Sequence, residues 1–325
     1  MRAILCKELG PANTLVIDDI PSPEPGKGQV KVRVKAAGLN FPDTLIIEGK
    51  YQIKPELPFS PGGEMAGEVL AVGEGVQRFK PGQRVMGLTG YGAFAEEILV
   101  PENQLIPVPD GMNDHTAAAF SMVYGTSYHA LKQRANLQPG ETLLVLGASG
   151  GVGLAAVEIG KAMGARVIAA ASSADKLAVA KAAGADELIN YSEASLKDEI
   201  KRLTDGNGAD VIYDPVGGDL FDQAIRAIAW NGRLLVVGFA SGRIPELPVN
   251  LALLKGASVV GVFWGSFAQR QPQDNAANFQ QLFGWFAEGK LKPLVSRVYP
   301  LEQAAQAIND LGQRKAVGKV VVQLR

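Results

Sequence analysis

Residues 142–153 read Thr-Leu-Leu-Val-Leu-Gly-Ala-Ser-Gly-Gly-Val-Gly, an apolar run that leads directly into a glycine-rich turn. Beyond the turn, apolar side chains recur at helical spacing, at Val152, Ala155, Ala156, Ile159 and Met163. Glycines let the backbone approach a pyrophosphate, and the N–H groups at the start of a helix favour its negative charge. The pattern therefore predicts the strand, turn and helix that open a dinucleotide-binding domain.

The glycines at 147, 150, 151 and 153 give G-x-x-G-G-x-G rather than G-x-G-x-x-G, and such a turn on its own also fits a purely structural role. The sequence that follows favours the nucleotide. Strands are expected at 167–170, 188–190, 211–213, 234–237 and 259–263, and helices at 175–183, 196–203 and 221–229. Alternating strands and helices predict a parallel sheet that is covered on both faces.

The first 120 residues favour short strands separated by turns, which is typical of a small barrel. Strands are expected at 30–34, 67–72, 84–86 and 93–100. A helix over 116–131 leads to the nucleotide domain, and helices at 278–288 and 301–311 precede a final strand at 319–324. We expect a first domain of residues 1–120 completed by 266–325, and a nucleotide-binding domain of residues 121–265.

The composition excludes several classes of protein. The 325 residues carry 32 basic and 33 acidic side chains, a net charge of −1, which lacks the basic footprint of a nucleic-acid binder. No apolar run reaches the roughly 18 residues of a membrane span. The single cysteine, Cys6, excludes an internal disulfide framework, and the first residues do not follow the plan of a signal peptide. We expect a cytoplasmic protein.

Three segments carry a family resemblance: Ala-Gly-Leu-Asn-Phe-Pro-Asp at 37–43, Pro-Gly-Gly-Glu-Met-Ala-Gly at 61–67 and Lys-Pro-Gly-Gln-Arg-Val at 80–85. With the glycine turn and the segments 189–191, 237–239 and 318–321, they resemble the medium-chain dehydrogenase/reductase superfamily, specifically its zinc-free, zeta-crystallin-like quinone oxidoreductase branch. The resemblance covers the whole chain. It implies a GroES-like barrel, a six-stranded doubly wound Rossmann sheet, and a cofactor in the cleft between the domains.

Many members of that superfamily bind a catalytic zinc through a Cys and a His of the first domain. Their Gly-His-Glu segment reads Gly62-Gly63-Glu64 here, and Cys6 is remote from it in the sequence. We expect His115 and His129 to be surface or packing residues. The sequence predicts no metal site, and without a Lewis acid alcohol oxidation is disfavoured.

The end of the second strand bears on the choice of nicotinamide cofactor. NAD-binding domains usually place a carboxylate there, on the ribose 2′-hydroxyl. Here Ser172, Ser173 and Lys176 follow the strand, which suits a 2′-phosphate and hence NADPH, while Asp175 begins the next helix. The resemblance adds Tyr191, Arg314 and Lys319 as phosphate neighbours, although the two cations also fit a solvated surface. The expected cofactor-binding residues are Asn40, Thr126, Gly147, Ser149, Gly150, Gly151, Val152, Gly153, Ser172, Ser173, Lys176, Tyr191, Phe239, Phe263, Arg314 and Lys319.

The resemblance also implies the catalytic residues Asn40, Tyr51 and Asp43. Asn40 is expected to donate to a substrate carbonyl as charge develops on it. Tyr51 would stack on a flat quinone or donate its hydroxyl. Asp43 fits equally as a helix cap, and Leu45 replaces a tyrosine that many quinone reductases carry. Glu64 remains open between a proton relay and a structural hydrogen bond.

These observations predict an NADPH-dependent reductase that transfers a hydride to quinones or related electron-poor enones without a metal, with the proton taken from solvent. One alternative is an NADPH-dependent reductase of enoyl thioesters or alkenals. Another is a non-catalytic NADPH-binding protein, and the balanced charge argues against an RNA-binding role.

The segment 257–263 is apolar, rich in β-formers and last in the predicted sheet. An exposed apolar edge favours pairing with another strand, and the resemblance implies that this edge pairs with its twin in a homodimer. The alternative is an edge covered by the helices of the chain's own C-terminal part.

Overall fold

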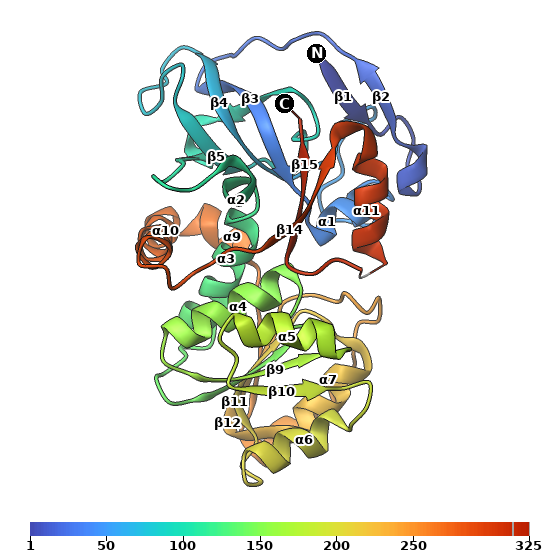
Figure 1. Ribbon diagram of the computed structural model, residues 1–325, viewed down its shortest axis with the longest axis vertical. Coiled ribbons are helices and arrows are strands. Elements are labelled where there is room, and N and C mark those ends of the chain that lie inside the picture. The colour runs from blue at the N-terminus through green and yellow to red at the C-terminus, as the bar shows by residue number, and fades with distance from the viewer. Residues whose placement is uncertain (314, 325) are drawn as a thin grey trace. The chain divides into compact units, whose positions relative to one another are not determined.

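The computed structural model describes residues 1–313 and 315–324. The chain divides into two compact units, each described by itself below (Figure 1). Unit 1 comprises Met1–Met122 and Pro293–Arg325, and unit 2 comprises Val123–Lys292.

A parallel sheet of six strands forms the centre of unit 2. Its order is β10-β9-β8-β11-β12-β13, and every neighbouring pair is parallel. The strand order reverses between β8 and β11, which is the switch point at which doubly wound sheets bind their ligands. The predicted fold class is confirmed. The strands are β8 (Thr142–Leu146), β9 (Arg166–Ala171), β10 (Glu187–Asn190), β11 (Ala209–Asp214), β12 (Ile228–Val236) and β13 (Ser258–Gly261).

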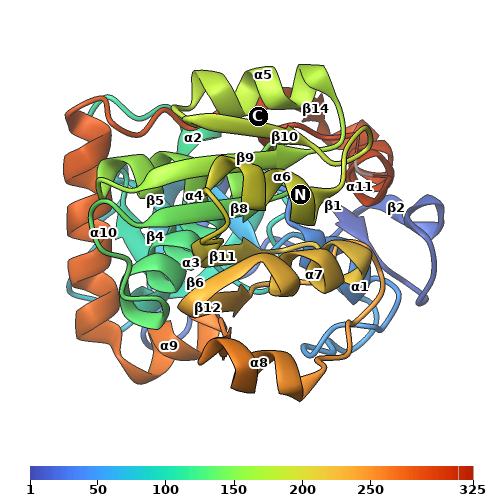
Figure 2. The same cartoon turned by 90° about the horizontal axis from the view of Figure 1, so that it is seen from below.

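Helices cover both faces of this sheet, with α4 and α5 on one side and α6 and α7 on the other (Figures 1 and 2). Leu144, Ile168 and Ile212 of the strands pack with Leu196 of α6 and Phe221 of α7 in one buried cluster. The helices of unit 2 are α3 (Ser121–His129, whose first two residues belong to unit 1), α4 (Gly151–Ala162), α5 (Ala174–Ala182), α6 (Leu196–Leu203), α7 (Gly218–Ala224), α8 (Val249–Lys255), α9 (Trp264–Arg270) and α10 (Pro272–Ala287).

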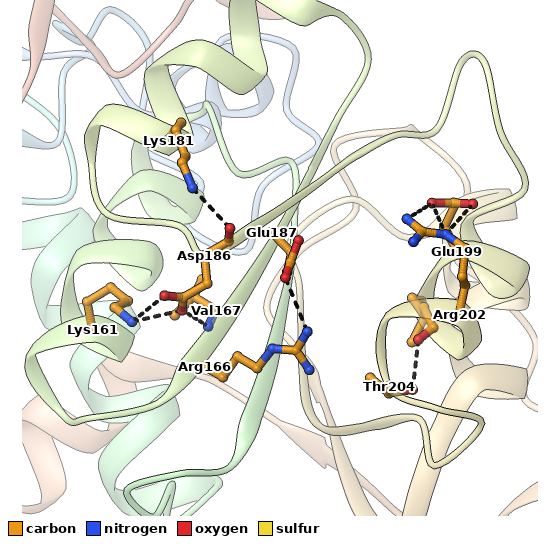
Figure 3. A network of polar contacts seen from close by, with 10 residues as sticks. Lys161, Arg166, Val167, Lys181, Asp186, Glu187, Glu199, Arg202 and Thr204 are labelled. Carbon is orange, nitrogen blue, oxygen red and sulfur yellow. Dashed lines mark hydrogen bonds and ion pairs between the residues drawn. The ribbon is translucent and has the colours of Figure 1, made fainter.

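A polar network fastens the amino-terminal ends of β9 and β10 to the helices that precede them (Figure 3). Both carboxylate oxygens of Asp186 lie 2.8 Å from the Lys161 ammonium of α4, and one of them accepts the backbone N–H of Val167 at 2.7 Å. Lys181 of α5 donates to the Asp186 carbonyl at 3.0 Å. The network lies at the end of the sheet opposite to the glycine-rich turn.

Unit 1 is rich in β-structure, as predicted, and is built on a seven-stranded sheet of order β14-β15-β3-β4-β5-β7, with β6 also paired to β3. The strands are β3 (Gln29–Gly38), β4 (Glu64–Val72), β5 (Arg84–Leu88), β6 (Glu97–Pro101), β7 (Leu105–Pro107), β14 (Val295–Pro300) and β15 (Lys319–Gln323). β1 (Arg2–Leu5) and β2 (Val16–Asp19) form a separate antiparallel pair. The helices are α1 (Phe41–Ile46), α2 (Asp114–Ala118) and α11 (Ala304–Gly312).

The compact units divide the chain at a different place from the predicted domains, since residues 266–292, expected to complete the first domain, belong to unit 2. The contacts of α9 and α10 explain this. Within unit 2, the indole Nε1 of Trp264 donates to Asn275 at 2.9 Å, Gln133 donates to Asn278 at 2.9 Å, and the rings of Tyr128 and Trp285 meet edge to face. These helices pack beside α3 within unit 2.

The predicted helix at 116–131 is broken into α2 and α3 at Ala119–Phe120, and a π-helical turn follows at Ala130–Arg134. The N–H of Met122, at the start of α3, donates to the carboxylate of Glu64 at 2.8 Å, which satisfies a group that a helix start leaves without a partner. The predicted helix at 221–229 ends earlier, since β12 begins at Ile228. Over the described residues, no helix has the length and apolarity of a membrane span.

Candidate functional site

The glycine-rich turn of unit 2 is held in a conformation that two of its glycines make possible. Gly147 follows β8 with a φ of +58°, in the left-handed region. A Cβ on Gly153 would lie 2.3 Å from the Gly147 carbonyl oxygen, so the first turn of α4 approaches the loop as closely as its backbone allows. Ser127 of α3 donates to the Val152 carbonyl at 2.8 Å. The amino end of α4 is therefore firmly placed to bind an anion.

The end of β9 brings together the polar residues that the sequence indicates for the cofactor. The Lys176 ammonium lies 3.3 Å from the Ser172 hydroxyl, and the Ser173 hydroxyl accepts the Lys176 N–H at 3.4 Å as the cap of α5. Ser192, which the sequence analysis missed, donates to the Ser172 carbonyl at 3.0 Å. Asp175 lies in the first turn of α5 and not at the end of the strand. This grouping combines an ammonium and hydroxyl groups, which suits a phosphate monoester.

The other residues predicted for the cofactor come from several different parts of the chain. Tyr191 packs against the core of unit 2, Thr126 is half-buried on α3, and Phe239 lies beside Gly217. Phe263 is 63% exposed at the start of α9. Arg314 lies outside the described residues.

Unit 1 contains a buried cluster of charged and polar side chains at the meeting point of β15, β3 and β4. The Lys319 ammonium lies 2.6 Å from the side-chain oxygen of Asn40, 2.7 Å from the Leu39 carbonyl and 3.0 Å from a carboxylate oxygen of Glu64. Asn40 donates from its amide nitrogen to the same carboxylate oxygen at 2.9 Å. All of these side chains are more than nine-tenths buried. Glu64 is thereby engaged in structural hydrogen bonds and an ion pair.

Asp43 extends this cluster along α1. One carboxylate oxygen accepts the N–H of Asn40 at 2.7 Å, and the other accepts the N–H of Gly63 at 3.1 Å. Burial raises the pKa of Asp43 to about 7, the hydrogen bond from Asn40 and the charge of Lys319 act to lower it, and the charge of Glu64 raises it. Asp43 is thus a carboxyl group that changes its charge near neutral pH.

Tyr51 lies beyond the end of α1, half-buried against the core of unit 1. Burial raises the pKa of its phenol, and the negative charge of Asp43 raises it further. Two buried hydroxyl groups in this unit, those of Thr89 and Ser121, have no hydrogen-bond partner among the described residues. The N–H of Thr89 donates to the Gly63 carbonyl, and Ser121 precedes Met122, whose N–H binds Glu64. No pattern in the sequence indicates that the Thr89 or the Ser121 hydroxyl belongs to a site.

The segment Gly62-Gly63-Glu64, where the sequence predicts no metal site, belongs to the same part of unit 1. Among the residues that the structure describes, no three His, Cys, Asp or Glu side chains gather as a metal site would require. A Cβ at Gly63 would lie 3.2 Å from the Gly90 carbonyl oxygen, so a larger side chain would be crowded there. His129 stacks on Phe267 with 4.0 Å between the ring centres, as a packing residue.

Comparison with known proteins gives matches over the whole chain. Residues 26–110 match the alcohol dehydrogenase GroES-like domain, and residues 151–284 match the zinc-binding dehydrogenase family. The chain is 45% identical over 325 residues to the quinone oxidoreductase-like protein 2 homolog of Nematostella vectensis, covering 99% of this chain and 88% of that protein. It is 38% identical to the quinone oxidoreductase of Pseudomonas aeruginosa, covering 96% of each.

Solved structures show the same fold. The quinone oxidoreductase of Pseudomonas syringae pv. tomato matches with a TM-score of 0.93 and 35% identity over 99% of each chain. The Escherichia coli quinone oxidoreductase, complexed with NADPH, matches with a TM-score of 0.92 and 29% identity over the full length of both chains.

The raised pKa of Asp43 predicts a pH dependence of stability. The folded protein binds this proton more tightly than the unfolded chain, so the contribution to stability is full below about pH 4 and is lost as the pH rises through 7. Relative to Asp43→Asn, the unfolding free energy of the wild type should fall by up to about 1.4 kcal/mol per pH unit over this range. Urea unfolding of both proteins between pH 5 and 8 measures the difference, and parallel curves would contradict it.

Proposed function

Since the chain belongs to the quinone oxidoreductase branch of the medium-chain dehydrogenase/reductase superfamily, we propose that it is an NADPH-dependent reductase that transfers a hydride to quinones or related electron-poor enones. Its GroES-like unit and its six-stranded Rossmann sheet are those of the superfamily. The observation that carries the proposal is the grouping of Ser172, Ser173 and Lys176 beside a glycine-rich turn at the switch point of the sheet.

The residues of unit 2 fit the cofactor. The amino end of α4, with Gly150, Gly151 and Val152, would bind the pyrophosphate, because its N–H groups and the helix dipole favour negative charge. Ser172, Ser173 and Lys176 would bind the 2′-phosphate that distinguishes NADPH from NADH. Gly147, Ser149 and Gly153 shape the turn, and Tyr191, Thr126, Phe239 and Phe263 are proposed as further neighbours of the cofactor.

NADPH supplies the hydride when it is bound, and the protein orients it and excludes water. In unit 1, Tyr51 is proposed to contact the substrate with its ring and hydroxyl, since it is half-buried and lies close to the charge of Asp43. As a donor to substrate, Asn40 would have to release one of the two acceptors of its amide nitrogen, the Glu64 carboxylate or the Gly38 carbonyl. Its catalytic role therefore stays a prediction.

We also propose that the protein acts as a homodimer through the edge strand β13. This strand is terminal in the sheet and pairs with β12 alone among the described strands. Apolar side chains around it are exposed, with Trp230 69%, Leu253 81% and Phe263 63% accessible. An apolar strand edge of this kind favours pairing with a second copy, and a two-fold contact closes the assembly.

A substrate panel tests the proposed activity. NADPH oxidation should be fastest with 1,4-benzoquinone and slower with an alkenal and a crotonyl thioester, and it should survive exhaustive treatment with EDTA or phenanthroline. A preference for the thioester would favour the alternative reductase, and binding of NADPH without turnover of any substrate would favour a non-catalytic protein. Activity lost together with stoichiometric zinc would refute the metal-free mechanism.

Lys176→Ala should weaken NADPH binding by about ten- to a hundredfold, since a charge-assisted contact contributes about 1.5–3 kcal/mol. NADH binding should change little, because NADH lacks the 2′-phosphate. Fluorescence titration with both cofactors measures the effect, and Lys181→Ala on the same helix, whose ammonium binds the Asp186 carbonyl, is the matched control. Equal affinities of the wild type for NADPH and NADH would contradict the proposed binding of the 2′-phosphate.

Val259→Pro should abolish dimer formation. The N–H of Val262 donates to β12, so the alternation of the strand directs the N–H of Val259 to the opposite side, where a second copy would pair. Sedimentation at micromolar concentration should give dimers for the wild type and monomers for the variant, with unchanged circular dichroism. A monomeric wild type would count decisively against the dimer.

A further inference from the structure

The family resemblance implies that Lys319 binds a phosphate of the cofactor. Its contacts in the structure are instead with groups of the protein itself. Its side chain is 6% exposed, and an ammonium group has three hydrogens to donate. Three acceptors surround it within unit 1: the Leu39 carbonyl, the side-chain oxygen of Asn40 and the Glu64 carboxylate. Its donor capacity is therefore met inside the protein.

These contacts determine which way the Asn40 carboxamide faces. Its oxygen lies 2.6 Å from the ammonium, and its nitrogen donates to Glu64 at 2.9 Å and to the Gly38 carbonyl at 3.3 Å. A rotation of the amide by 180° would bring its NH₂ group against the ammonium and its oxygen against the carboxylate. Lys319 and Glu64 together permit one orientation only.

The backbone of Asn40 is in turn hydrogen-bonded to Asp43. The N–H of Asn40 donates to the Asp43 carboxylate at 2.7 Å, and the N–H of Asp43 donates to the Asn40 carbonyl at 2.9 Å. The start of α1 is thus anchored on the ammonium of β15. The ammonium holds Asn40 directly and Asp43 through the backbone of Asn40, the two residues at the start of α1 that the family resemblance implies for catalysis.

The same cluster sets the electrostatic surroundings of Asp43. The charged and titratable groups that act on it or respond to it are Lys319 of β15, Glu64 of β4 and Tyr51 beyond α1. One buried cation thus faces two buried carboxyl groups. Removal of the cation makes ionisation of Asp43 less favourable, and neutralisation of Glu64 makes it more favourable.

We propose that Lys319 is a positioning residue for the reduction rather than a ligand of the cofactor's phosphate: its ammonium fixes the Asn40 carboxamide and balances the charge of Asp43. This inference rests on the proposed function, in which Tyr51 contacts the substrate and Asp43 acts on Tyr51 through its charge. Each hydride transferred to a quinone requires one proton at the oxygen that gains charge. That proton comes from solvent through the Tyr51 hydroxyl, and the charge of Asp43 next to Tyr51 governs how readily it is delivered.

The test compares Lys319→Met, Glu64→Gln and the double variant Lys319→Met/Glu64→Gln, with Lys315→Met as the control at an exposed lysine. Fluorescence titration gives the Kd for NADPH, and ¹³C NMR of labelled aspartate gives the titration of Asp43 in the cofactor-free protein. Steady-state kinetics with benzoquinone give kcat and KM over pH 5–9. The first two measurements need no turnover, so they remain decisive if the proposed activity fails in the wild type.

For Lys319→Met we expect an unchanged Kd for NADPH within about twofold, a kcat lowered at least tenfold, and an Asp43 titration moved to higher pH. Glu64→Gln should move that titration to lower pH, and the double variant should bring it back toward the wild-type value. The midpoint of the kcat profile should move in the same directions. Lys315→Met should leave all of these quantities unchanged.

Two results would overturn the proposal. A Kd for NADPH raised tenfold or more in Lys319→Met, with the Asp43 titration unmoved, would identify Lys319 as a phosphate ligand. A lower kcat in Lys319→Met, without opposite shifts of the Asp43 titration in Lys319→Met and Glu64→Gln, would mean that Lys319 has only a structural role. If Lys319→Met does not fold, the double variant, which lacks the uncompensated carboxylate, decides between these outcomes through its Kd and its kcat.

Discussion

The buried ion pair between Lys319 and Glu64, 3.0 Å apart, is the interaction on which the rest of unit 1 depends. A carboxylate with no exposed surface is costly unless a cation and hydrogen bonds compensate it. Here the compensating groups come from β15, from Asn40 after β3 and from the N–H of Met122 at the start of α3. One charge pair therefore fixes how strands, helix starts and the α1 segment meet.

The fold of unit 2 is largely predictable because its strands and helices are indicated by residues that lie close together in the sequence. An apolar run, a glycine turn and a helical pattern follow one another within 142–163, and the later strands repeat this order. The domain boundary was not predictable in the same way. The patterns of α9 and α10 indicate helices with an apolar face, yet nothing in them specifies which core they cover, and the pairing of Trp264 with Asn275 and of Gln133 with Asn278 places them in unit 2.

The candidate site likewise has one part that the sequence predicts and another part that it does not. Ser172, Ser173 and Lys176 lie within five residues, and the sequence identifies them as a group that the structure brings together. The three partners of Lys319 are 255, 279 and 280 residues away, so no spacing in the sequence indicates them. The raised pKa of Asp43 depends on burial by distant segments, as does the burial of the Thr89 and Ser121 hydroxyls, which have no partner among residues 1–313 and 315–324. Phe263, between β13 and α9, is 63% exposed.

The composition of unit 1 from two separate segments has a consequence for biosynthesis. Unit 2 is one continuous segment, from Val123 to Lys292. In unit 1, β3 can pair with β15 only after the whole of unit 2 has been synthesised. At a synthesis rate of about 5–20 residues per second, Glu64 spends on the order of 13–50 s without its counter-charge. During this interval the nascent barrel has an open edge at β3 and an unneutralised acid. Nascent-chain protection by chaperones is therefore most needed at residues 1–122, which are synthesised before the rest of unit 1.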